Sequence, residues 1–355
     1  MSHIQILLPF GLPPPELVPD LLRALQAPAL ATLLGRARSG KLSAQATTFD
    51  AFSRALPHEI WLSRQYGLDH APGGTANSPQ IAAAAMKTYG LTPDDGVWFM
   101  LQPVHIHIAR DHLVLTDQRQ LALSEPEARA LFDSAKPLFD EVGKTLLYGD
   151  AKTWFMRADD WAMLQTSTPD AACGHNIDIW MPKGPAERDW RKLQNEVQMH
   201  WHIHPLNEER ESRGDKTVNS LWLWGAADAA RQGSASRYDA CFNLPDWMQA
   251  FGHATGNKNR AVDAAGVIAA APGHGLLVLD TLIPAGLGGD WSEWLDQVHQ
   301  LESLWFAPLL AALRARKIDQ ISLTLTHNSR LATFHATPLS LHKFWVKPSL
   351  AKLKQ

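Results

Sequence analysis

The sequence predicts an α/β fold in which a mostly parallel sheet carries helices on both faces. Short apolar runs of strand length recur between longer amphipathic stretches along the 355 residues. Hydrophobic residues make up 45% and charged residues 19% of the chain, which is typical of a folded protein and not of a disordered one. Strands that alternate with helices in this way favour a sheet covered on both sides.

The first ninety residues predict one strand and three helices. An apolar run at 4–8 is followed by Pro9 and Gly11, which is typical of a buried strand that ends in a turn. Proline is favoured at the first helical position, so Pro28 is expected to begin a helix. The predicted helices span 16–26, 28–36 and 82–89.

Hairpin signals dominate the middle of the chain. A strand at 98–109 is expected to pair with 113–116, and a further strand is expected at 154–157. Ser124 precedes an amphipathic helix at 125–142 with acidic residues in its first turn. We therefore predict an inserted smaller α+β domain at 93–184, and a core formed by 1–92 and 185–355.

The last part of the chain returns to alternating elements. Apolar residues spaced by four predict a helix at 188–204 that Pro205 ends, and a long helix is expected at 291–314. The predicted strands are short apolar runs at 221–224, 265–270, 276–280 and 321–326.

Charge and hydropathy exclude several classes of protein. The formal charge is −3 and the pI is near 6.6, so the chain has no basic field to attract nucleic acid. No run of about 18 apolar residues occurs, so no membrane span is predicted. The first residues lack the basic region of a signal peptide, and the expected location is the cytoplasm.

Sixteen histidines raise the possibility of a metal site. His200 and His204 share one face of the predicted helix, a spacing that zinc sites use. His105 and His107 alternate on a predicted strand and are expected to face the same side. Neither pair carries the other residues of a known metal motif, and a structural or surface role is the preferred interpretation of both.

The segment 204–225 is the most specific part of the sequence. It has a His-Pro-Leu-Asn helix end at 204–207, a charged turn that ends at Gly214, and an Asn-containing strand that closes on Gly225. This arrangement resembles the archaeal-type cofactor-independent phosphoglycerate mutases, and the resemblance extends over most of the chain. It implies an alkaline-phosphatase-like core with a mostly parallel sheet. The segments 102–105 and 221–225 also resemble proteobacterial phosphoglycerate-mutase-like regulatory proteins of the pathogenicity-factor (rpf) cluster type.

Active members of this superfamily hold two divalent cations with Asp and His ligands, and the resemblance identifies the corresponding positions. Phe10 stands where the first strand of the family ends in Asp. Ile283 and Leu287 stand where the family has the Asp and the His of its Asp-x-x-Gly-His signature. Thr326 replaces the Asp of the closing Asp-His pair, while His327 is retained.

Two further positions bear on catalysis. His335 is the candidate for the last histidine ligand of the family. The segment that carries the Ser or Thr nucleophile is not recognisable, although Thr75 and Ser78 lie in roughly the right region. With no carboxylate ligand left, the site lacks the charge that hard, oxygen-preferring cations need.

The sequence therefore predicts a pseudoenzyme with no assigned catalytic residue and no metal cofactor. The alternative is an active mutase or phosphatase that holds Mn, Zn or Mg with unorthodox ligands. The expected partner is an unknown protein or a small anionic ligand. A structural role in the core is the preferred interpretation of four residues, which are also the candidates for binding an anion: His204, Asn207, Arg210 and Asn219.

Overall fold

The computed structural model describes residues 2–39, 47–50, 52–69, 77–234, 236–249, 251, 260–343 and 345–354. The chain divides into two compact units. Unit 1 comprises Met1–Ala51 and Ala235–Gln355, and unit 2 comprises Phe52–Ser234, which interrupts unit 1 in the sequence. Within the described part of the chain, no helix is long and apolar enough to cross a membrane.

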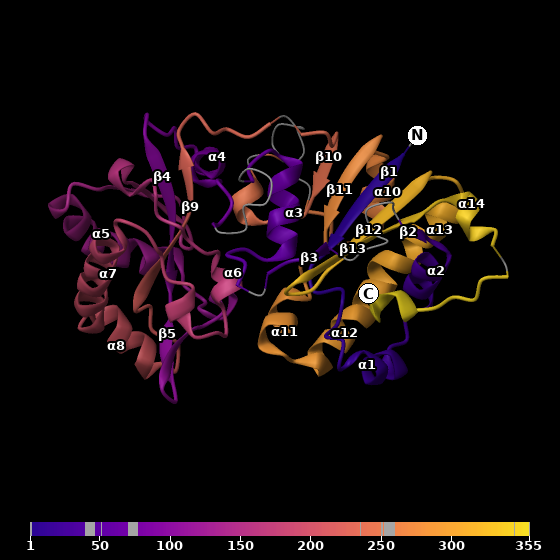
Figure 1. The fold of residues 1–355 in the computed structure, drawn as a ribbon, viewed down its shortest axis with the longest axis horizontal. Coiled ribbons are helices and arrows are strands. Elements are labelled where there is room, and N and C mark those ends of the chain that lie inside the picture. The colour runs from indigo at the N-terminus through magenta and orange to yellow at the C-terminus, as the bar shows by residue number, and fades with distance from the viewer. Residues whose placement is uncertain are drawn as a thin grey trace. The chain divides into compact units, whose positions relative to one another are not determined.

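A seven-stranded mixed sheet forms the centre of unit 1, in the order β10-β11-β1-β12-β13-β2, with β3 also paired to β13 (Figure 1). The first four strands of this order are mutually parallel, and β13 and its neighbours are antiparallel. All residues of β1 and β12 except the first are buried, so both faces of these strands are covered. The strands are β1 (His3–Leu8), β2 (Arg38–Ser39), β3 (Thr47–Thr48), β10 (Ala240–Phe242), β11 (His274–Val278), β12 (Gln320–Thr326) and β13 (Arg330–Ala336).

Helices of unit 1 connect these strands. The long helix predicted at 291–314 is present as α12 and α13 joined by a π-helical segment, Glu302–Phe306. Glu302 in this segment is buried, and its carboxylate accepts the backbone N–H groups of Ala29 and Leu30 at the start of α2. The helices are α1 (Val18–Ala24), α2 (Pro28–Arg36), α10 (Ala264–Ala270), α11 (Ile283–Gly288), α12 (Trp291–Leu301), α13 (Ala307–Arg314) and α14 (Pro338–Leu341).

An antiparallel four-stranded sheet, in the order β7-β8-β4-β9, forms the centre of unit 2. A separate hairpin joins β5 to β6, which confirms the hairpin predicted from the sequence. The strands are β4 (Val97–Val104), β5 (Ile106–Ala109), β6 (His112–Leu115), β7 (Thr145–Tyr148), β8 (Trp154–Arg157) and β9 (Ser220–Asp228).

Helices α4, α5 and α7 of unit 2 pack against this sheet. Helix α5 begins with the predicted Ser124 capping box, in which Glu127 accepts the Ser124 backbone N–H. The helices are α3 (Pro57–Gln65), α4 (Ala82–Ala85), α5 (Glu125–Glu141), α6 (Pro169–Ala172), α7 (Glu187–His202) and α8 (Pro205–Ser212).

The bounds of unit 2 differ from those of the predicted insert at 93–184. Strand β9, which lies beyond the predicted end, pairs with β4 along its whole length, from Val97 opposite Asp228 to Val104 opposite Ser220. Helix α7 packs on both α5 and β9. The middle unit therefore needs the residues after 184 to complete its own sheet, which hairpin signals within 93–184 could not indicate.

One predicted element is wrong. The apolar run at 265–270 forms helix α10 instead of a strand, because Asp263 caps it and its alanines are strong helix formers. The helix predicted at 188–204 is present as α7 and ends at His202, while Pro205 begins α8 instead of only stopping a helix. His204 is the N-cap residue of α8, so His200 and His204 do not share one helix face.

A row of polar side chains crosses the amino-terminal part of the unit 1 sheet. The buried Ser322 hydroxyl lies 2.8 Å from His3 Nε2 and 2.7 Å from His335 Nδ1. The His3 ring stacks on His274 with 4.7 Å between ring centroids. Burial, followed by the nearby His274, His335 and Arg237, lowers the pKa of His3 to about 4.

This row predicts loss of stability on acidification. The pKa of His3 is near 6.5 in the unfolded chain and lower in the folded one, so the folded state binds fewer protons between about pH 6.5 and 4. The free energy of unfolding, measured by urea denaturation, should fall as the pH drops through this window. His3→Gln should reduce the fall and the exposed-site variant His202→Gln should keep it. Equal pH dependence in wild type and His3→Gln would contradict the assignment.

Candidate functional site

The carboxyl ends of three parallel strands meet at one edge of the unit 1 sheet. Leu7 of β1 lies opposite both Val278 of β11 and Thr324 of β12, so the three strands end together. Open α/β sheets place their ligand sites at such an edge. The positions selected by family resemblance follow these strands: Phe10 after β1, Ile283 and Leu287 in α11 after β11, and Thr326 and His327 at the end of β12.

Phe10 occupies the centre of this edge. Its backbone adopts the left-handed region, with φ at 55°, which is rare for a residue other than glycine. The indole N–H of Trp294 donates to the Phe10 carbonyl oxygen at 2.8 Å. A Cβ atom added to Gly286 of α11 would lie 2.3 Å from Phe10 Cδ1, so the ring packs directly on the helix backbone.

The polar groups at this edge are few. The Thr326 hydroxyl is fully buried and accepts the backbone N–H of Phe10 at 3.4 Å. The His327 ring lies edge-on to the Phe10 ring, with 6.5 Å between centroids, and its buried Nδ1 has no hydrogen-bond partner among the described residues. Burial, followed by the charge of Arg330, lowers the pKa of His327 to about 4.

These residues do not fit the two divalent cations that the family resemblance implies. Two hard cations need several oxygen ligands and negative charge. Here the corresponding positions offer one imidazole and one hydroxyl, and that hydroxyl is bonded to the backbone of Phe10. The side chains of Phe10, Ile283 and Leu287 carry no ligand atoms. No metal-dependent step can be derived at this edge.

His335 does not join His327. In the antiparallel pair of β12 and β13, His335 lies opposite Ser322, whereas Thr326 lies opposite Leu331. Four residues of strand separate the two positions, which corresponds to about 13 Å. The interpretation of His335 as the last metal ligand is therefore a poor fit to the structure, because its Nδ1 contacts the Ser322 hydroxyl near the other end of β12.

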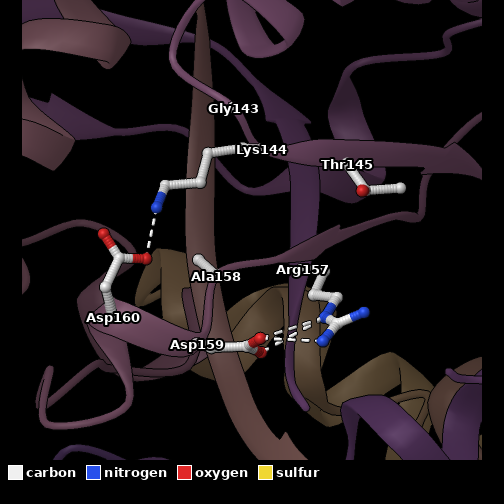
Figure 2. A pocket seen from close by; sticks show the side chains of 7 residues that line it. All are labelled: Gly143, Lys144, Thr145, Arg157, Ala158, Asp159 and Asp160. Carbon is white, nitrogen blue, oxygen red and sulfur yellow. Dashed lines mark hydrogen bonds and ion pairs between the residues drawn. The ribbon is translucent and has the colours of Figure 1, made fainter. Parts of the chain in front are cut away.

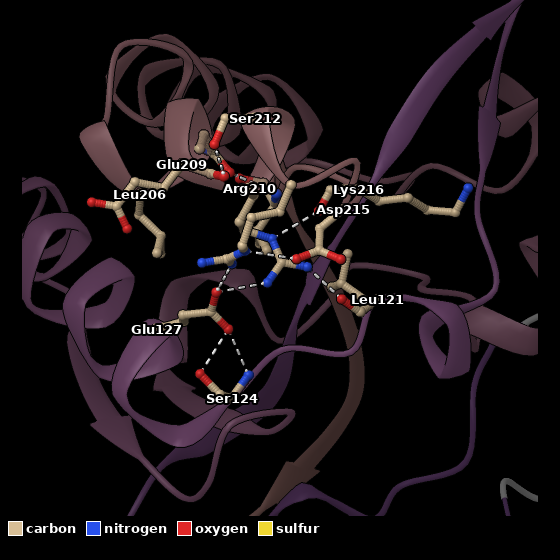
Figure 3. A network of polar contacts seen from close by, with 12 residues as sticks. Leu121, Ser124, Glu127, Leu206, Glu209, Arg210, Ser212, Asp215 and Lys216 are labelled. Carbon is tan, nitrogen blue, oxygen red and sulfur yellow. Dashed lines mark hydrogen bonds and ion pairs between the residues drawn. The ribbon is translucent and has the colours of Figure 1, made fainter.

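Arg210, the charged member of the predicted anion-binding group in unit 2, is bonded to groups within the protein (Figure 3). Arg210 is fully buried, and its guanidinium donates to the carbonyl oxygens of Lys216 (2.8 Å) and Leu121 and pairs with Glu127 at 3.1 Å. Burial alone would raise the pKa of Glu127. The hydrogen bonds from Ser124 and Arg213 and the charge of Arg210 outweigh it and lower this pKa to about 2.

The other members of this group also hold the chain together. The Asn207 amide donates to the carbonyl oxygens of Trp201 and Val218, and its oxygen accepts the Val218 N–H at 2.9 Å. Asn219 makes a two-way pair with the backbone of Ile106. His204 Nδ1 accepts the Leu206 N–H. A structural role accounts for these contacts, and the anion-binding hypothesis does not.

A surface hollow of about 360 Å³ lies elsewhere in unit 2 (Figure 2). Lys144 pairs with Asp160, and Arg157 pairs with Asp159 at 2.8 Å. Both cations of the hollow are therefore neutralised by neighbouring carboxylates, so it offers no free charge to a small anion. The residues that line it are Gly143, Lys144, Thr145, Arg157, Ala158, Asp159 and Asp160.

A second buried group in unit 2 was not anticipated from the sequence. Ligand atoms of His58, Glu59 and Asp170 all lie within 4.8 Å of one another. His58 and Glu59 stand in the first turn of α3, and Asp170 stands in the first turn of α6, so helix starts position all three. Burial, followed by Asp170, raises the pKa of Glu59 well above its ordinary value, and burial lowers the pKa of His58 to about 4.

The sequence carried a partial signal for this group. Pro57 followed by Glu59 is typical of a helix start with a capping box, and the structure has Glu59 Oε2 accepting the Leu56 N–H at 2.7 Å. Nothing in the local pattern connects this turn to Asp170, more than a hundred residues later. The fold alone brings them together.

Of the two residues named for the nucleophile region, the structure describes Ser78. Ser78 is buried, lies 2.7 Å from the Thr166 hydroxyl and accepts the Gly225 backbone N–H at 2.9 Å. These contacts tie the segment before α4 to β9 and are structural. Thr75 lies outside the described residues.

The contacts of Arg210 predict a large loss of stability on truncation. Arg210→Ala leaves two carbonyl oxygens without their donor and removes one of the two cations beside Glu127, so the free energy of unfolding should fall by about 3–5 kcal/mol in urea denaturation. Arg213→Ala is the matched control, because Arg213 pairs with the same Glu127 from a half-exposed position. Its cost should stay near or below about 1 kcal/mol.

The same variants test the anion hypothesis. Phosphate, sulfate and 3-phosphoglycerate should not stabilise wild type through this segment, because ligand binding raises stability only where a site is free. A rise in melting temperature with 3-phosphoglycerate that is lost in Arg210→Ala and kept in Arg213→Ala would contradict the structural assignment.

Comparisons with known proteins find relatives of low sequence identity. No family model matches the chain. A 2,3-bisphosphoglycerate-independent phosphoglycerate mutase from Methanosarcina mazei is 24% identical over 226 residues, which covers 63% of this chain. A probable enzyme of the same name from Geobacter sulfurreducens is 24% identical over 297 residues, 78% of this chain. The matched segment spans 52% of the first relative's length and 71% of the second's.

Solved structures give a likeness in fold. The PH0037 protein from Pyrococcus horikoshii matches with a TM-score of 0.52 and 13% identity, over 95% of this chain and 87% of that one. This agreement is consistent with the α/β core expected from the sequence. The chain is thus weakly homologous to cofactor-independent phosphoglycerate mutases and shares the fold of the PH0037 protein.

Proposed function

We propose that this chain is a phosphoglycerate-mutase-like protein that does not catalyse metal-dependent phosphoryl transfer at the unit 1 sheet edge. The observation that carries the proposal is Phe10. In the related enzymes this position is expected to carry a carboxylate, and here an aromatic ring packs on Gly286 within van der Waals distance. Two-cation chemistry needs ligands that stabilise the entering and leaving oxygens together.

The neighbouring positions support the same conclusion. Ile283 and Leu287 add apolar surface, and an ion placed among them would lose solvation without gaining ligands. His327 has a lowered pKa and is therefore neutral at pH 7, yet a single imidazole cannot hold two cations. A remodelled edge of this kind suits a protein that binds a partner or ligand without turning it over.

We also propose a regulatory role, which the rpf-type resemblance implies, and a cytoplasmic location. A protein partner is favoured over a small anion. The guanidinium of Arg210 is bonded to groups within the protein. The two cations of the surface hollow, Lys144 and Arg157, are paired with Asp160 and Asp159.

An activity assay tests the proposal. Untagged protein, supplied in turn with Mn²⁺, Zn²⁺ and Mg²⁺, should interconvert 2- and 3-phosphoglycerate no faster than a heat-killed sample, and should not hydrolyse a phosphomonoester. An archaeal-type mutase run alongside serves as the positive control. Metal-dependent turnover that disappears in Thr326→Ala and His327→Ala, while both variants remain folded, would overturn the proposal.

A further inference from the structure

The three ligand atoms of the His58 group have the spacing of an incomplete coordination sphere. One imidazole nitrogen and two carboxylate oxygens lie within 4.8 Å of one another, and no other such group occurs in the described part of the chain. Four tetrahedral ligands at about 2.1 Å from an ion lie about 3.4 Å apart. Side-chain rotations that move atoms by about 1 Å would therefore bring the three onto one ion.

Glu59 is held in place by bonds to one oxygen only. Its Oε2 accepts the Leu56 N–H and the Thr168 hydroxyl, each at 2.7 Å. Among the described residues, Oε1 receives no hydrogen bond. Bonds of this kind to the second oxygen orient metal-ligating carboxylates and leave the first oxygen for the ion.

The buried charge around the group is unbalanced when the carboxylates are ionised. Arg119 pairs with Asp170 at 2.6 Å and with Asp117 at 2.8 Å. Asp117 is buried, and its Oδ2 has no hydrogen-bond partner among the described residues. Arg119 is ion-paired with two of the three carboxylates and no cation is paired with Glu59 among the described residues, so ionisation of all three leaves two negative charges in a buried place where unpaired charge is costly. A divalent cation supplies the missing charge.

The donor set selects the class of ion. Imidazole nitrogen suits zinc and its first-row neighbours, while Mg²⁺ and Ca²⁺ prefer oxygen ligands alone. We infer that His58, Glu59 and Asp170 bind a divalent first-row transition-metal ion such as Zn²⁺. The inference concerns unit 2 and does not depend on the proposed function, which concerns the sheet edge of unit 1.

Direct binding tests the inference. Untagged full-length protein is stripped with a chelator, dialysed, and titrated with Zn²⁺ by calorimetry, with bound metal counted by mass spectrometry of the digested sample. Wild type should hold one tight equivalent. Glu59→Gln keeps the capping hydrogen bond at Leu56 but removes the carboxylate, and Asp170→Asn keeps an acceptor for Arg119. Each should weaken this equivalent at least as much as the loss of an outer-shell partner does, about 10–100-fold.

A matched histidine control separates this site from adventitious binding. His200 is exposed on α7, so His200→Gln should keep the tight equivalent at wild-type affinity. Co²⁺ added in place of Zn²⁺ should give visible absorption bands that are lost in Glu59→Gln and in Asp170→Asn. Circular dichroism verifies the fold of each variant, and Asp170→Asn decides if Glu59→Gln fails to fold. No tight equivalent in wild type, or an affinity in the folded carboxylate variants within threefold of wild type, would overturn the inference.

Discussion

The contact between the Phe10 ring and the backbone of α11 is the constraint on which the unit 1 sheet edge depends. The ring occupies the space that a side chain at position 286 would need, so only glycine fits there. The left-handed backbone of Phe10 is held on both sides, by the Trp294 indole at its carbonyl oxygen and by the Thr326 hydroxyl at its N–H. An edge that accepts ligands in related folds is therefore closed by packing and backbone hydrogen bonds.

Unit 2 shows two different ways to bury charge. Around Arg210 the carboxylate of Glu127 is paired with two guanidinium groups, and the network joins α5, α8 and the loop before β9. Around Glu59 the guanidinium of Arg119 is shared among too many carboxylates. The first arrangement stabilises the fold and needs nothing further. The second leaves negative charge uncompensated when Glu59 is ionised, which is why it and not the first carries the inference of a bound cation.

Most of the buried helices and strands could be predicted from the sequence, whereas the features that depend on long-range pairing could not. Strand β1 and helix α2 follow from an apolar run and an N-terminal proline, signals that lie within a few residues. Strand β13, by contrast, was not predicted, although its residues alternate between buried and half-buried, and its position is fixed by pairing with β12. The apolar side chain of Phe10 at this position could be anticipated from the family resemblance, because the change concerns one position in the sequence. The group formed by Glu59 and Asp170 could not, because only the fold brings two distant helix starts together.

The sign of one substitution tests the Phe10 contact most directly. On helix propensity alone Gly286→Ala should raise the free energy of unfolding, since alanine is favoured over glycine by about 0.5–1 kcal/mol within a helix. The account predicts the opposite, a loss of about 1–3 kcal/mol in urea denaturation, because the added Cβ meets the Phe10 ring. Gly288→Ala, with open space around its Cβ, should show no loss, and Phe10→Ala should abolish the penalty at Gly286 in a double-mutant cycle. A stabilising Gly286→Ala, or costs that simply add with Phe10→Ala, would contradict the closed edge.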